Sequence, residues 1–267
     1  MGITRVKDLM EFLESIAPFD LQEGYDNSGH LVGNPDMEVT GVLCSLDCTE
    51  EIISEAVDRN CNVVVAHHPI IFGGIKRLTG NTYIDRTVIK AIKNDVAIIA
   101  IHTNLDNVLS NGVNEKIANR LGLEDVNILV PKVSAHTDYE TGSGITGYLK
   151  EPMDPMEFLQ FLKESMNASI VKYTSLVKEE IHKVAVCGGS GRFLLDHAIQ
   201  ASADVFISAD FKYHDYFDAN GQIIIADIGH YESEQFTIEL LYDLINENFS
   251  NFAAHYSNHN TNPVKYL

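Results

Sequence analysis

Tryptophan is absent from the 267-residue sequence, and cysteine occurs only four times. The cysteines are Cys44, Cys48, Cys61 and Cys187, and no two of them form a C-x-x-C pair, so the sequence predicts no disulfide framework. We expect buried, reduced thiols of the kind found in cytoplasmic proteins.

Long apolar runs are also missing. No stretch approaches the roughly 20 consecutive apolar residues that a membrane span needs. The opening residues, M-G-I-T-R-V, contain no apolar signal region, and Val6 breaks the myristoylation pattern. These absences predict a cytoplasmic protein that does not associate with membranes.

Basic residues are scarce, since 19 lysines and arginines stand against 38 aspartates and glutamates and give a formal net charge of -19. A surface of this charge repels nucleic-acid backbones, so general nucleic-acid binding is not expected. A small anionic substrate is still compatible, because bound cations would reverse the local sign. The remaining composition is that of a globular protein with one large or two modest domains.

Strand-like and helix-like segments alternate along the first part of the chain, which indicates βαβ units and a mostly parallel sheet. Thr4 and Thr49 are the expected N-caps of two helices, and Gly122 closes a later one. The predicted strands are 39–46, 62–66 and 96–101, and the predicted helices include 83–93 and 111–121.

The pattern breaks between residues 124 and 147, which we interpret as the passage into a second α/β unit. A last helix, from residue 231 to about 246, is expected to return to the first unit. The second unit has predicted strands at 145–149, 184–187, 205–207 and 223–226, and helices at 155–165 and after Gly191.

Two adjacent histidines end the strand that reads V-V-V-A-H-H-P-I-I-F. His67 and His68 follow four apolar residues, and Pro69 helps the chain to turn there. Ligands of open α/β sheets gather at the carboxyl ends of strands, so this pair marks a candidate site. A pair with a purely structural role is the alternative.

The next predicted strand ends in H-T-N-L-D-N, a second polar cluster. Asp106 offers a hard oxygen ligand. His102 is a ligand, a partner that orients a ligand, or a core histidine.

A third strand end reads I-A-D-I-G-H-Y-E-S-E-Q-F. His230 and Glu234 are four residues apart, so on a helix they lie on one face and suit two ligands of one site. The alternative is a solvated first turn with acidic residues near a helix N-terminus. Glu232 points elsewhere and is expected at the surface.

Taken together, three strand ends supply five candidate metal ligands: His67, His68, Asp106, His230 and Glu234. Mixed imidazole and carboxylate donors suit zinc, iron or manganese. Five donors exceed the three of an open catalytic zinc site and fit two divalent ions about 3.5–4 Å apart. Two such cations would polarise a substrate and lower the pKa of bound water, which supplies a nucleophile.

Three further segments are weaker candidates. The segment C-G-G-S-G follows a strand and opens a helix, where its backbone N–H groups either bind an anion or allow tight packing. The segment F-K-Y-H-D offers Lys212 and His214, which either face the same cleft or begin a surface helix. The turn Y-D-N-S-G-H contains Asp26 and Asn27, an unusually specific pair for a segment that only has to turn the chain.

The motifs in combination resemble the Nif-three-like (NGG-one-interacting-factor-three-like) family, whose members are often described as GTP cyclohydrolase I type 2 homologues. The matching segments run in order over nearly the whole chain. They are Y-D-N-S-G-H-L-V-G, A-H-H-P-I-I-F, H-T-N-L-D, C-G-G-S-G, K-Y-H, G-H-Y-E-S-E and T-N-P-V, the last at residues 261–264.

The resemblance implies an α/β protein of two α/β domains, with mixed sheets flanked by helices and a dinuclear metal site. We place the first domain at residues 1–126 plus 228–267 and the second at 127–227. The family's ligands fall on the same five residues, and the family implies two divalent ions (Zn, Fe or Mn) per subunit and a homohexamer. The chain is too short for the extra domain that some members insert.

Two residues depart from the family pattern. Tyr25 stands where tryptophan is usual, and His30 stands where an apolar residue is usual. His30 therefore either alters substrate contacts or faces solvent.

The leading functional hypothesis is a metal-dependent hydrolase acting on a nucleotide or related small molecule, with GTP ring opening as the first candidate reaction. His102 and His214 are the candidates for moving protons, because histidine is the usual acid or base near neutral pH. The alternatives are a non-enzymatic hexameric metal-binding scaffold and a metal-handling protein.

Overall fold

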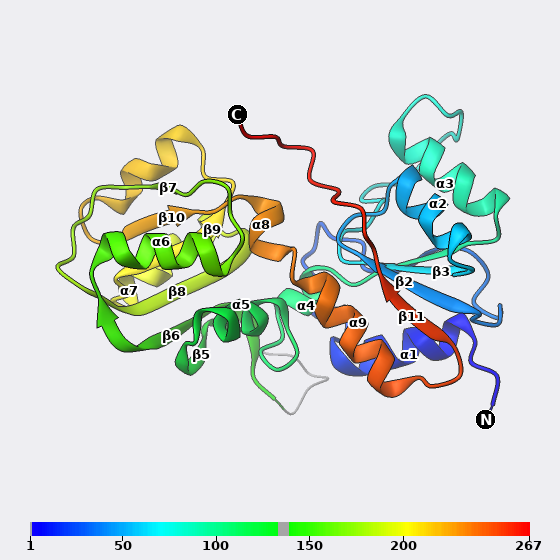
Figure 1. The fold of residues 1–267 in the computed structure, drawn as a ribbon, viewed down its shortest axis with the longest axis horizontal. Coiled ribbons are helices and arrows are strands. Elements are labelled where there is room, and N and C mark those ends of the chain that lie inside the picture. The colour runs from blue at the N-terminus through cyan, green and yellow to red at the C-terminus, as the bar shows by residue number, and fades with distance from the viewer. Residues whose placement is uncertain (1, 133–138) are drawn as a thin grey trace. The chain divides into compact units, whose positions relative to one another are not determined.

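The computed structural model describes residues 2–132 and 139–267 (Figure 1). The chain divides into two units. The first comprises Met1–Leu105 and Thr237–Pro263, and the second comprises Asp106–Phe236 and Val264–Leu267. This division assigns residues 106–126, 228–236 and 264–267 to the second unit, whereas the sequence-based bounds place them in the first domain. Each unit is an α/β layer structure with a mixed sheet, the predicted fold class.

The first unit contains a five-stranded sheet in the order β1-β4-β3-β2-β11. β2 (Gly41–Ser45), β3 (Val63–Ala66) and β4 (Ala97–Ala100) run parallel, and all three lie within two residues of the predicted bounds. β11 (Ala253–Tyr256) pairs parallel with β2, and β1 (Gly29–Val32) pairs antiparallel with β4. Every residue of the three central strands is buried, as expected for strands covered on both faces.

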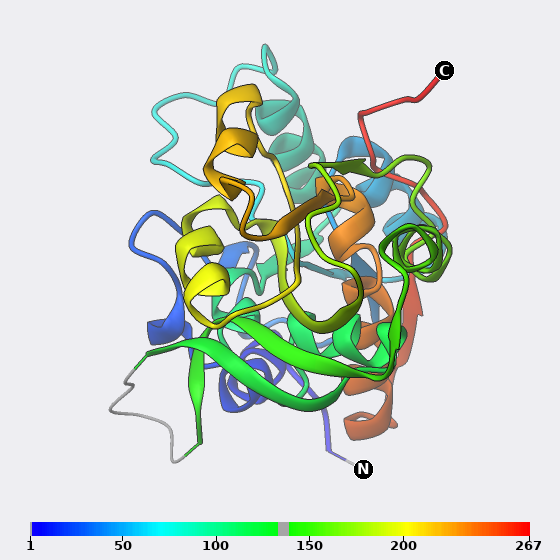
Figure 2. The same cartoon turned by 90° about the vertical axis from the view of Figure 1, so that its left-hand side faces the viewer.

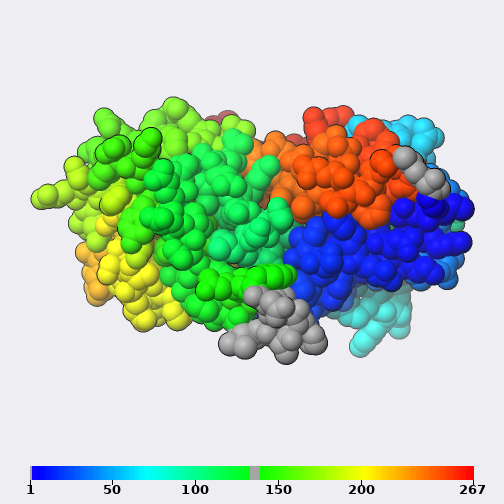
Figure 3. All heavy atoms as spheres, turned by 90° about the horizontal axis from the view of Figure 1, so that it is seen from below, coloured from blue at the N-terminus to red at the C-terminus, as the bar shows by residue number. Residues whose placement is uncertain are grey.

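Helices cover both faces of this sheet (Figure 1). α2 (Glu50–Asp58) and α3 (Tyr83–Lys93) lie on one face, and α1 (Val6–Ile16) and α9 (Thr237–Asn248) lie on the other. The surfaces of α1 (blue) and α9 (orange) lie side by side in Figure 3. One helical layer is therefore built from the two separate segments of the first unit.

Helix α1 begins one residue later than predicted, because its N-cap is Arg5 rather than Thr4. The Thr4 hydroxyl donates to Oδ1 of Asn251 at 3.2 Å, and the Thr4 carbonyl accepts from the backbone N–H of Val39. These contacts keep Thr4 in extended chain. The Asp8 carboxylate instead accepts from the backbone N–H of Arg5 at 2.7 Å.

Two other helix ends form as the sequence predicts. The Thr49 hydroxyl caps α2 and accepts from the backbone N–H of Ile52 at 3.4 Å. Gly122 ends α5 (Val113–Leu121) in the left-handed conformation, with φ of 62°, which glycine adopts without a Cβ clash.

The second unit contains a six-stranded mixed sheet in the order β5-β6-β8-β9-β10-β7. Its parallel centre is formed by β8 (Ile181–Ser190), β9 (Val205–Ala209) and β10 (Ile224–Asp227). The antiparallel strands are β5 (Glu124–Lys132), β6 (Thr141–Met153) and β7 (Lys172–Tyr173). Figure 2 shows β5 and β6 as a long, curved pair (green). Most of the region expected as a passage between units therefore forms regular sheet.

Helices and short 3-10 segments complete the two units. Helix α6 spans the predicted residues, and the Asp154 carboxylate caps it by accepting from two backbone N–H groups. In the second unit these elements are α6 (Pro155–Ser165), η2 (Arg192–Leu194), α7 (Leu195–Gln200), η3 (Tyr213–Ala219) and α8 (His230–Glu234). Helix α4 (Thr103–Asp106) contains the boundary between the units. The 3-10 segment η1 (Phe19–Leu21) belongs to the first unit.

The predicted last helix is in fact two helices, α8 and α9. The break falls at Gln235 and Phe236. The Gln235 amide donates to the Met166 carbonyl at 2.8 Å, and the Arg120 guanidinium lies 3.4 Å from the centroid of the Phe236 ring. Both contacts are within the second unit, so they hold the end of α8 there and separate it from α9.

All four cysteines are buried, as predicted, and none forms a disulfide in the residues that the structure describes. Burial raises the pKa of the thiols of Cys44, Cys48 and Cys187. Within residues 2–132 and 139–267, no helix combines the length and apolar character needed to cross a membrane.

Candidate functional site

Three histidines of the first unit meet at the carboxyl ends of two neighbouring parallel strands. His67 and His68 follow β3, and His102 follows β4. Their ligand nitrogens all lie within 4.8 Å of one another, and their ring centroids are 5.0 to 5.3 Å apart. We name these three residues the imidazole cluster. The sequence predicts this convergence, because adjacent parallel strands end at the same edge of a sheet.

Each ring of the imidazole cluster is held through Nδ1. His67 Nδ1 donates to the Ile101 carbonyl at 2.9 Å, and His68 Nδ1 donates to Oδ1 of Asp47 at 2.8 Å. A carbonyl or carboxylate oxygen only accepts, so Nδ1 carries a proton, and in the neutral ring Nε2 therefore carries the lone pair. Metal-binding histidines show this arrangement, in which an outer acceptor fixes the tautomer and the ring orientation.

Asp26 holds His102 in the same way. His102 Nδ1 donates to Oδ1 of Asp26 at 2.8 Å, while Oδ2 of Asp26 accepts from the Thr103 hydroxyl at 2.5 Å. Burial opposes ionisation, but the hydrogen bonds from His102, Thr103 and the Asn27 backbone outweigh it and hold the pKa of Asp26 well below its usual range. The turn motif Y-D-N-S-G-H thus supplies the carboxylate that orients His102.

The two departures from the family pattern lie in this same segment. Tyr25 is 69% exposed. His30 lies in β1, where its Nε2 pairs with the Val32 carbonyl at 2.9 Å. His30 therefore bonds within its own strand.

The second unit carries a second group of ligand-type side chains, which we name the carboxylate cluster: Asp106, His230 and Glu234. His230 and Glu234 lie on α8, and His230 Nε2 is 3.1 Å from Oε2 of Glu234, as the predicted four-residue spacing requires. The ligand oxygens of Asp106 and Glu234 lie within 4.8 Å of each other. Glu234 is 3% exposed, so its charge needs a cationic partner.

His230 lies between two carboxylates. Its Nδ1 donates to Oδ2 of Asp210 at 2.7 Å, and its Nε2 faces Glu234. Burial by itself would lower the pKa of His230, but the charge of Glu234 and the bonds to Asp210 and Glu234 raise it to about 11. A divalent cation would take the place of the Nε2 proton, because metal binding requires a neutral imidazole.

The segment C-G-G-S-G packs closely against Glu234 through Gly188 and Gly189. It belongs largely to β8, and η2 begins directly after Gly191 and leads into α7, as predicted. Its backbone N–H groups bond to side chains of the chain itself: Gly188 to Asn114, Gly189 to Ser233 and Gly191 to Ser208, at 2.8 to 3.0 Å. These bonds favour the tight-packing alternative over an anion-binding loop.

His214, the other candidate for proton transfer, lies on the exposed surface of η3. Its ring contacts Tyr213 and Phe217, with centroids 5.2 and 6.1 Å away. In the part of the chain that the structure describes, none of the ligand-atom clusters includes it. The predicted surface position of Glu232 is wrong, since this residue is 6% exposed and hydrogen-bonds with the Tyr266 hydroxyl.

Sequence reasoning did not identify Asp47 and Asp210 as site residues. Both follow parallel strands, β2 and β9, and each accepts a hydrogen bond from a ligand-type histidine. Their position just after a buried strand was the available signal, because it is the signal that identified the histidines.

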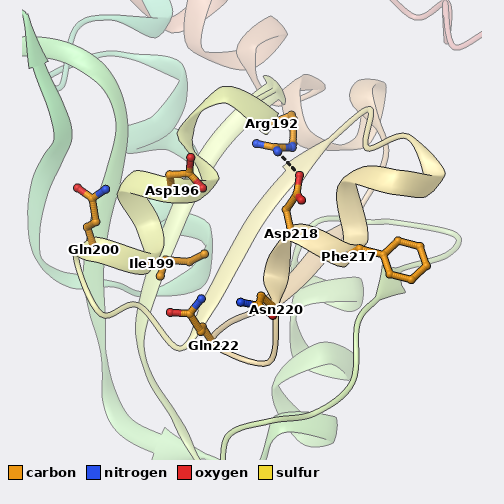
Figure 4. A pocket seen from close by; sticks show the side chains of 8 residues that line it. All are labelled: Arg192, Asp196, Ile199, Gln200, Phe217, Asp218, Asn220 and Gln222. Carbon is orange, nitrogen blue, oxygen red and sulfur yellow. Dashed lines mark hydrogen bonds and ion pairs between the residues drawn. The ribbon is translucent and has the colours of Figure 1, made fainter.

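A separate pocket of about 560 Å³ lies in the second unit (Figure 4). It is lined by Arg192, Phe217 and Asp218 together with the amides of Gln200, Asn220 and Gln222. The Arg192 guanidinium is already neutralised by Asp218 and by Asp215. None of the predicted site residues lines this pocket.

Residues 4–263 match the family described as Duf34/NIF3 (NGG1p interacting factor 3). The chain belongs to this family. The match confirms the resemblance carried by the sequence motifs, and the imidazole and carboxylate clusters are built from those motifs. Histidine and carboxylate donors at these distances are suited to binding metal ions.

Relatives and a solved structure extend over most of the chain. A Clostridium acetobutylicum protein named GTP cyclohydrolase 1 type 2 homolog is 35% identical, over 86% of this chain and 85% of its own length. A Staphylococcus epidermidis protein of the same name is 29% identical over 98% of this chain and 100% of its own. That alignment runs over 367 residues, 100 more than this chain contains, so this relative carries segments that the chain lacks.

The crystal structure of the Staphylococcus aureus protein SA1388 superposes with a TM-score of 0.92 at 31% identity, covering 100% of both chains. It therefore supports the α/β architecture with two mixed sheets flanked by helices.

Proposed function

We propose that the chain is a metal-dependent hydrolase that binds two divalent ions through His67, His68, Asp106, His230 and Glu234. In this proposal the imidazole cluster and the carboxylate cluster bind the same pair of ions. Zinc, iron and manganese are the candidate metals, because these ions accept imidazole nitrogen together with carboxylate oxygen.

One observation carries the proposal: all three proposed histidine ligands donate from Nδ1 to a fixed oxygen, which directs Nε2 to the ligand position. The acceptors are the Ile101 carbonyl, Asp47 and Asp210. A histidine that merely fills a core needs no such common orientation. The buried Glu234 carboxylate adds the negative charge that a divalent cation would compensate.

Two divalent ions would polarise the substrate and lower the pKa of bound water. The chain's own part is to hold these ligands rigidly and to move a proton. His102 is suited to the second task, because Asp26 fixes its Nδ1 proton and leaves Nε2 as the basic atom. His214 is the second candidate for that task, from the surface of η3.

The substrate we propose is a nucleotide or related small molecule, and the first reaction to test is the opening of the GTP ring. The support is the name shared by the relatives, GTP cyclohydrolase 1 type 2 homolog. We further propose that the protein acts as a homohexamer in the cytoplasm.

Turnover by metal-loaded protein tests this proposal. Purified protein is loaded separately with zinc, manganese and ferrous iron, bound metal is counted by elemental analysis, and product is followed with GTP and a panel of nucleotides. Asp106→Ala should lose metal and activity. Asp36→Ala removes an exposed carboxylate that is paired with Lys7, and it should retain both.

Each outcome has a separate meaning. Metal-dependent product that Asp106→Ala abolishes supports a hydrolase and begins to define its substrate. Full retention of two ions by Asp106→Ala overturns the ligand assignment. Full metal loading without product from any nucleotide overturns the proposed reaction and favours the scaffold or metal-handling alternatives.

A further inference from the structure

The segment after β11 runs along the first unit toward the carboxyl end of β2. β11 pairs parallel with β2, and the backbone N–H of Ser257 continues the ladder by donating to the Cys44 carbonyl at 2.8 Å. A parallel partner travels in the same direction as the strand beside it. The residues after Ser257 are therefore directed to the edge of the sheet where the imidazole cluster lies.

Glu55 anchors the beginning of this segment. The Ser257 hydroxyl donates to Oε2 of Glu55 at 2.5 Å, and the Asn258 backbone N–H donates to Oε1 at 3.0 Å. Glu55 is a buried residue of α2. The segment is thus attached to the first unit before it reaches the imidazole cluster.

Thr261 then contacts the carboxylate that holds His68. The Thr261 hydroxyl donates to Oδ2 of Asp47 at 2.5 Å, while Oδ1 of the same carboxylate accepts from His68 Nδ1 at 2.8 Å. Each oxygen of Asp47 thus has its own donor. The Asp47 side chain is 34% exposed and the His68 side chain 15%, so Asp47 is not fixed by burial alone.

We propose that Thr261 is a positioning residue for the metal site: it fixes the Asp47 carboxylate, which in turn fixes the ring and tautomer of His68. This inference rests on the proposed role of His68 as a ligand. Without the Thr261 hydroxyl, the partly exposed Asp47 carboxylate can rotate and exchange its bond to His68 for water. The motif T-N-P-V, which the proposed chemistry leaves unused, thereby acquires a role.

The residues beside Thr261 keep it in place. The Asn262 backbone N–H donates to Oδ1 of Asn260 at 2.9 Å, and Asn262 is itself buried. Pro263 restricts the backbone of Asn262 to extended conformations. The hydroxyl of Thr261 is therefore presented by an ordered segment.

The test compares Thr261→Val, which keeps the shape and removes the donor, with Thr261→Ser, which keeps the donor. Ser257→Ala is the matched control, because it removes a hydroxyl–carboxylate bond of the same length from the same segment, but to Glu55. One readout is the tautomer of His68 in metal-free protein, from long-range proton–nitrogen NMR. The other is the zinc dissociation constant, from competition with a chromophoric chelator.

We expect Thr261→Val to raise the zinc dissociation constant about 3- to 10-fold, somewhat less than the roughly 10- to 100-fold typical of losing a direct outer partner such as Asp47. Its His68 signals should show exchange between tautomers. Thr261→Ser should restore both readouts, and Ser257→Ala should leave both within about twofold of the native values. In an Asp47→Ala background, Thr261→Val should have no further effect.

Native affinity and a single His68 tautomer in Thr261→Val would overturn the inference. Equal losses in Thr261→Val and Ser257→Ala would also overturn it, because they would assign the effect to attachment of the segment. Failure of the native protein to bind zinc would instead overturn the proposed metal site, and the tautomer readout would still report on Thr261.

Discussion

Gly189 lies directly against the Glu234 carboxylate. Its φ is +63°, and a Cβ placed there would lie 2.2 Å from Oε1 of Glu234. Glycine therefore meets two requirements at this position: a left-handed backbone and room for a buried ligand-type oxygen. Gly189 offers no side chain to a metal ion, but the absence of a Cβ leaves room for the Glu234 carboxylate.

Gly189→Ala should therefore lower the free energy of unfolding and weaken zinc binding. The backbone conformation alone should cost about 1 kcal/mol, and the clash should add about 1–3 kcal/mol unless Glu234 moves. Gly221→Ala is the matched control, since Gly221 has φ of +68° in the same unit and nothing within 4 Å of the added Cβ. Urea denaturation and chelator competition measure both quantities; equal effects of the two substitutions would contradict this prediction.

Glu55 gives the first unit a defined response to acid. Burial by itself would raise the pKa of this carboxyl, but the bonds from Ser257, Asn258 and Arg59 outweigh it and lower the pKa below the ordinary 4.5. A lowered folded-state pKa contributes stability that is fully present above pH 4.5 and is lost as the pH falls through the folded value.

Glu55→Gln should therefore flatten the acid limb of the unfolding free energy, measured by urea titration at a series of pH values below 7. Ser257→Ala should flatten it in part, because it removes one of the bonds that lower the pKa. An acid limb as steep in Glu55→Gln as in the native protein would show that Glu55 is not its source.

Helix α6 is the element whose start depends most clearly on one side chain. Oδ1 of Asp154 accepts from the backbone N–H groups of Met156 and Glu157 at 2.8 and 3.2 Å, and Pro155 occupies the first helical position. Asp154→Ala should lower the free energy of unfolding by about 1 kcal/mol, the usual contribution of an N-cap, whereas Asp154→Asn should retain most of it. Denaturant titration checks both; indistinguishable variants would mean that the carboxylate oxygen is dispensable.

The strands that sequence reasoning identified are the interior strands of the two sheets. β3 and β4 read as unbroken apolar runs because helices cover both their faces. β9 and β10 are also fully buried, and each begins with three apolar residues. The strands it missed, β1, β5, β7 and β11, are the four edge strands. An edge strand has one neighbour and a more polar sequence, so its pairing depends on distant residues rather than on its own pattern.

The site residues also fall into two groups: those that the sequence identified and the partners that it could not assign. His67, His68 and His102 were identified because polar residues directly after neighbouring buried strands converge at one sheet edge, and Asp106 was identified as the carboxylate of the polar cluster that follows β4. The partners that orient them could not be assigned, because those contacts join residues far apart in the chain; Thr261 and Asp47 are separated by 214 positions. Periodicity and spacing describe local structure and carry no information about such pairs.

For the whole molecule, the cysteines offer a probe of each unit. Cys44, Cys48 and Cys61 lie in the first unit and Cys187 in the second, all of them buried. Burial raises the pKa of Cys187, with further contributions from Asp106 and Glu234. A thiol reagent should therefore label them only through opening of the unit that contains them.

Zinc at about 100 times its dissociation constant should slow labelling of all four cysteines by about 10- to 100-fold, if the ions bind residues of both units. Mass spectrometry of labelled peptides measures each site separately, and Asp106→Ala should abolish the protection. Protection confined to the cysteines of one unit would show that the metal is bound by that unit alone.

The discontinuity of the first unit sets an order of events during synthesis. The ribosome delivers β1 through β4 first, then the whole of residues 106–236, and only afterwards α9 and β11. The second unit can fold while β2 is still without its partner β11 and while α9 is still missing from its helical layer in the first unit. The hydroxyl of Thr261 can reach Asp47 only after β11 has been synthesised, so the contact that fixes His68 through Asp47 forms after the residues that hold His67 and His102 are already in place.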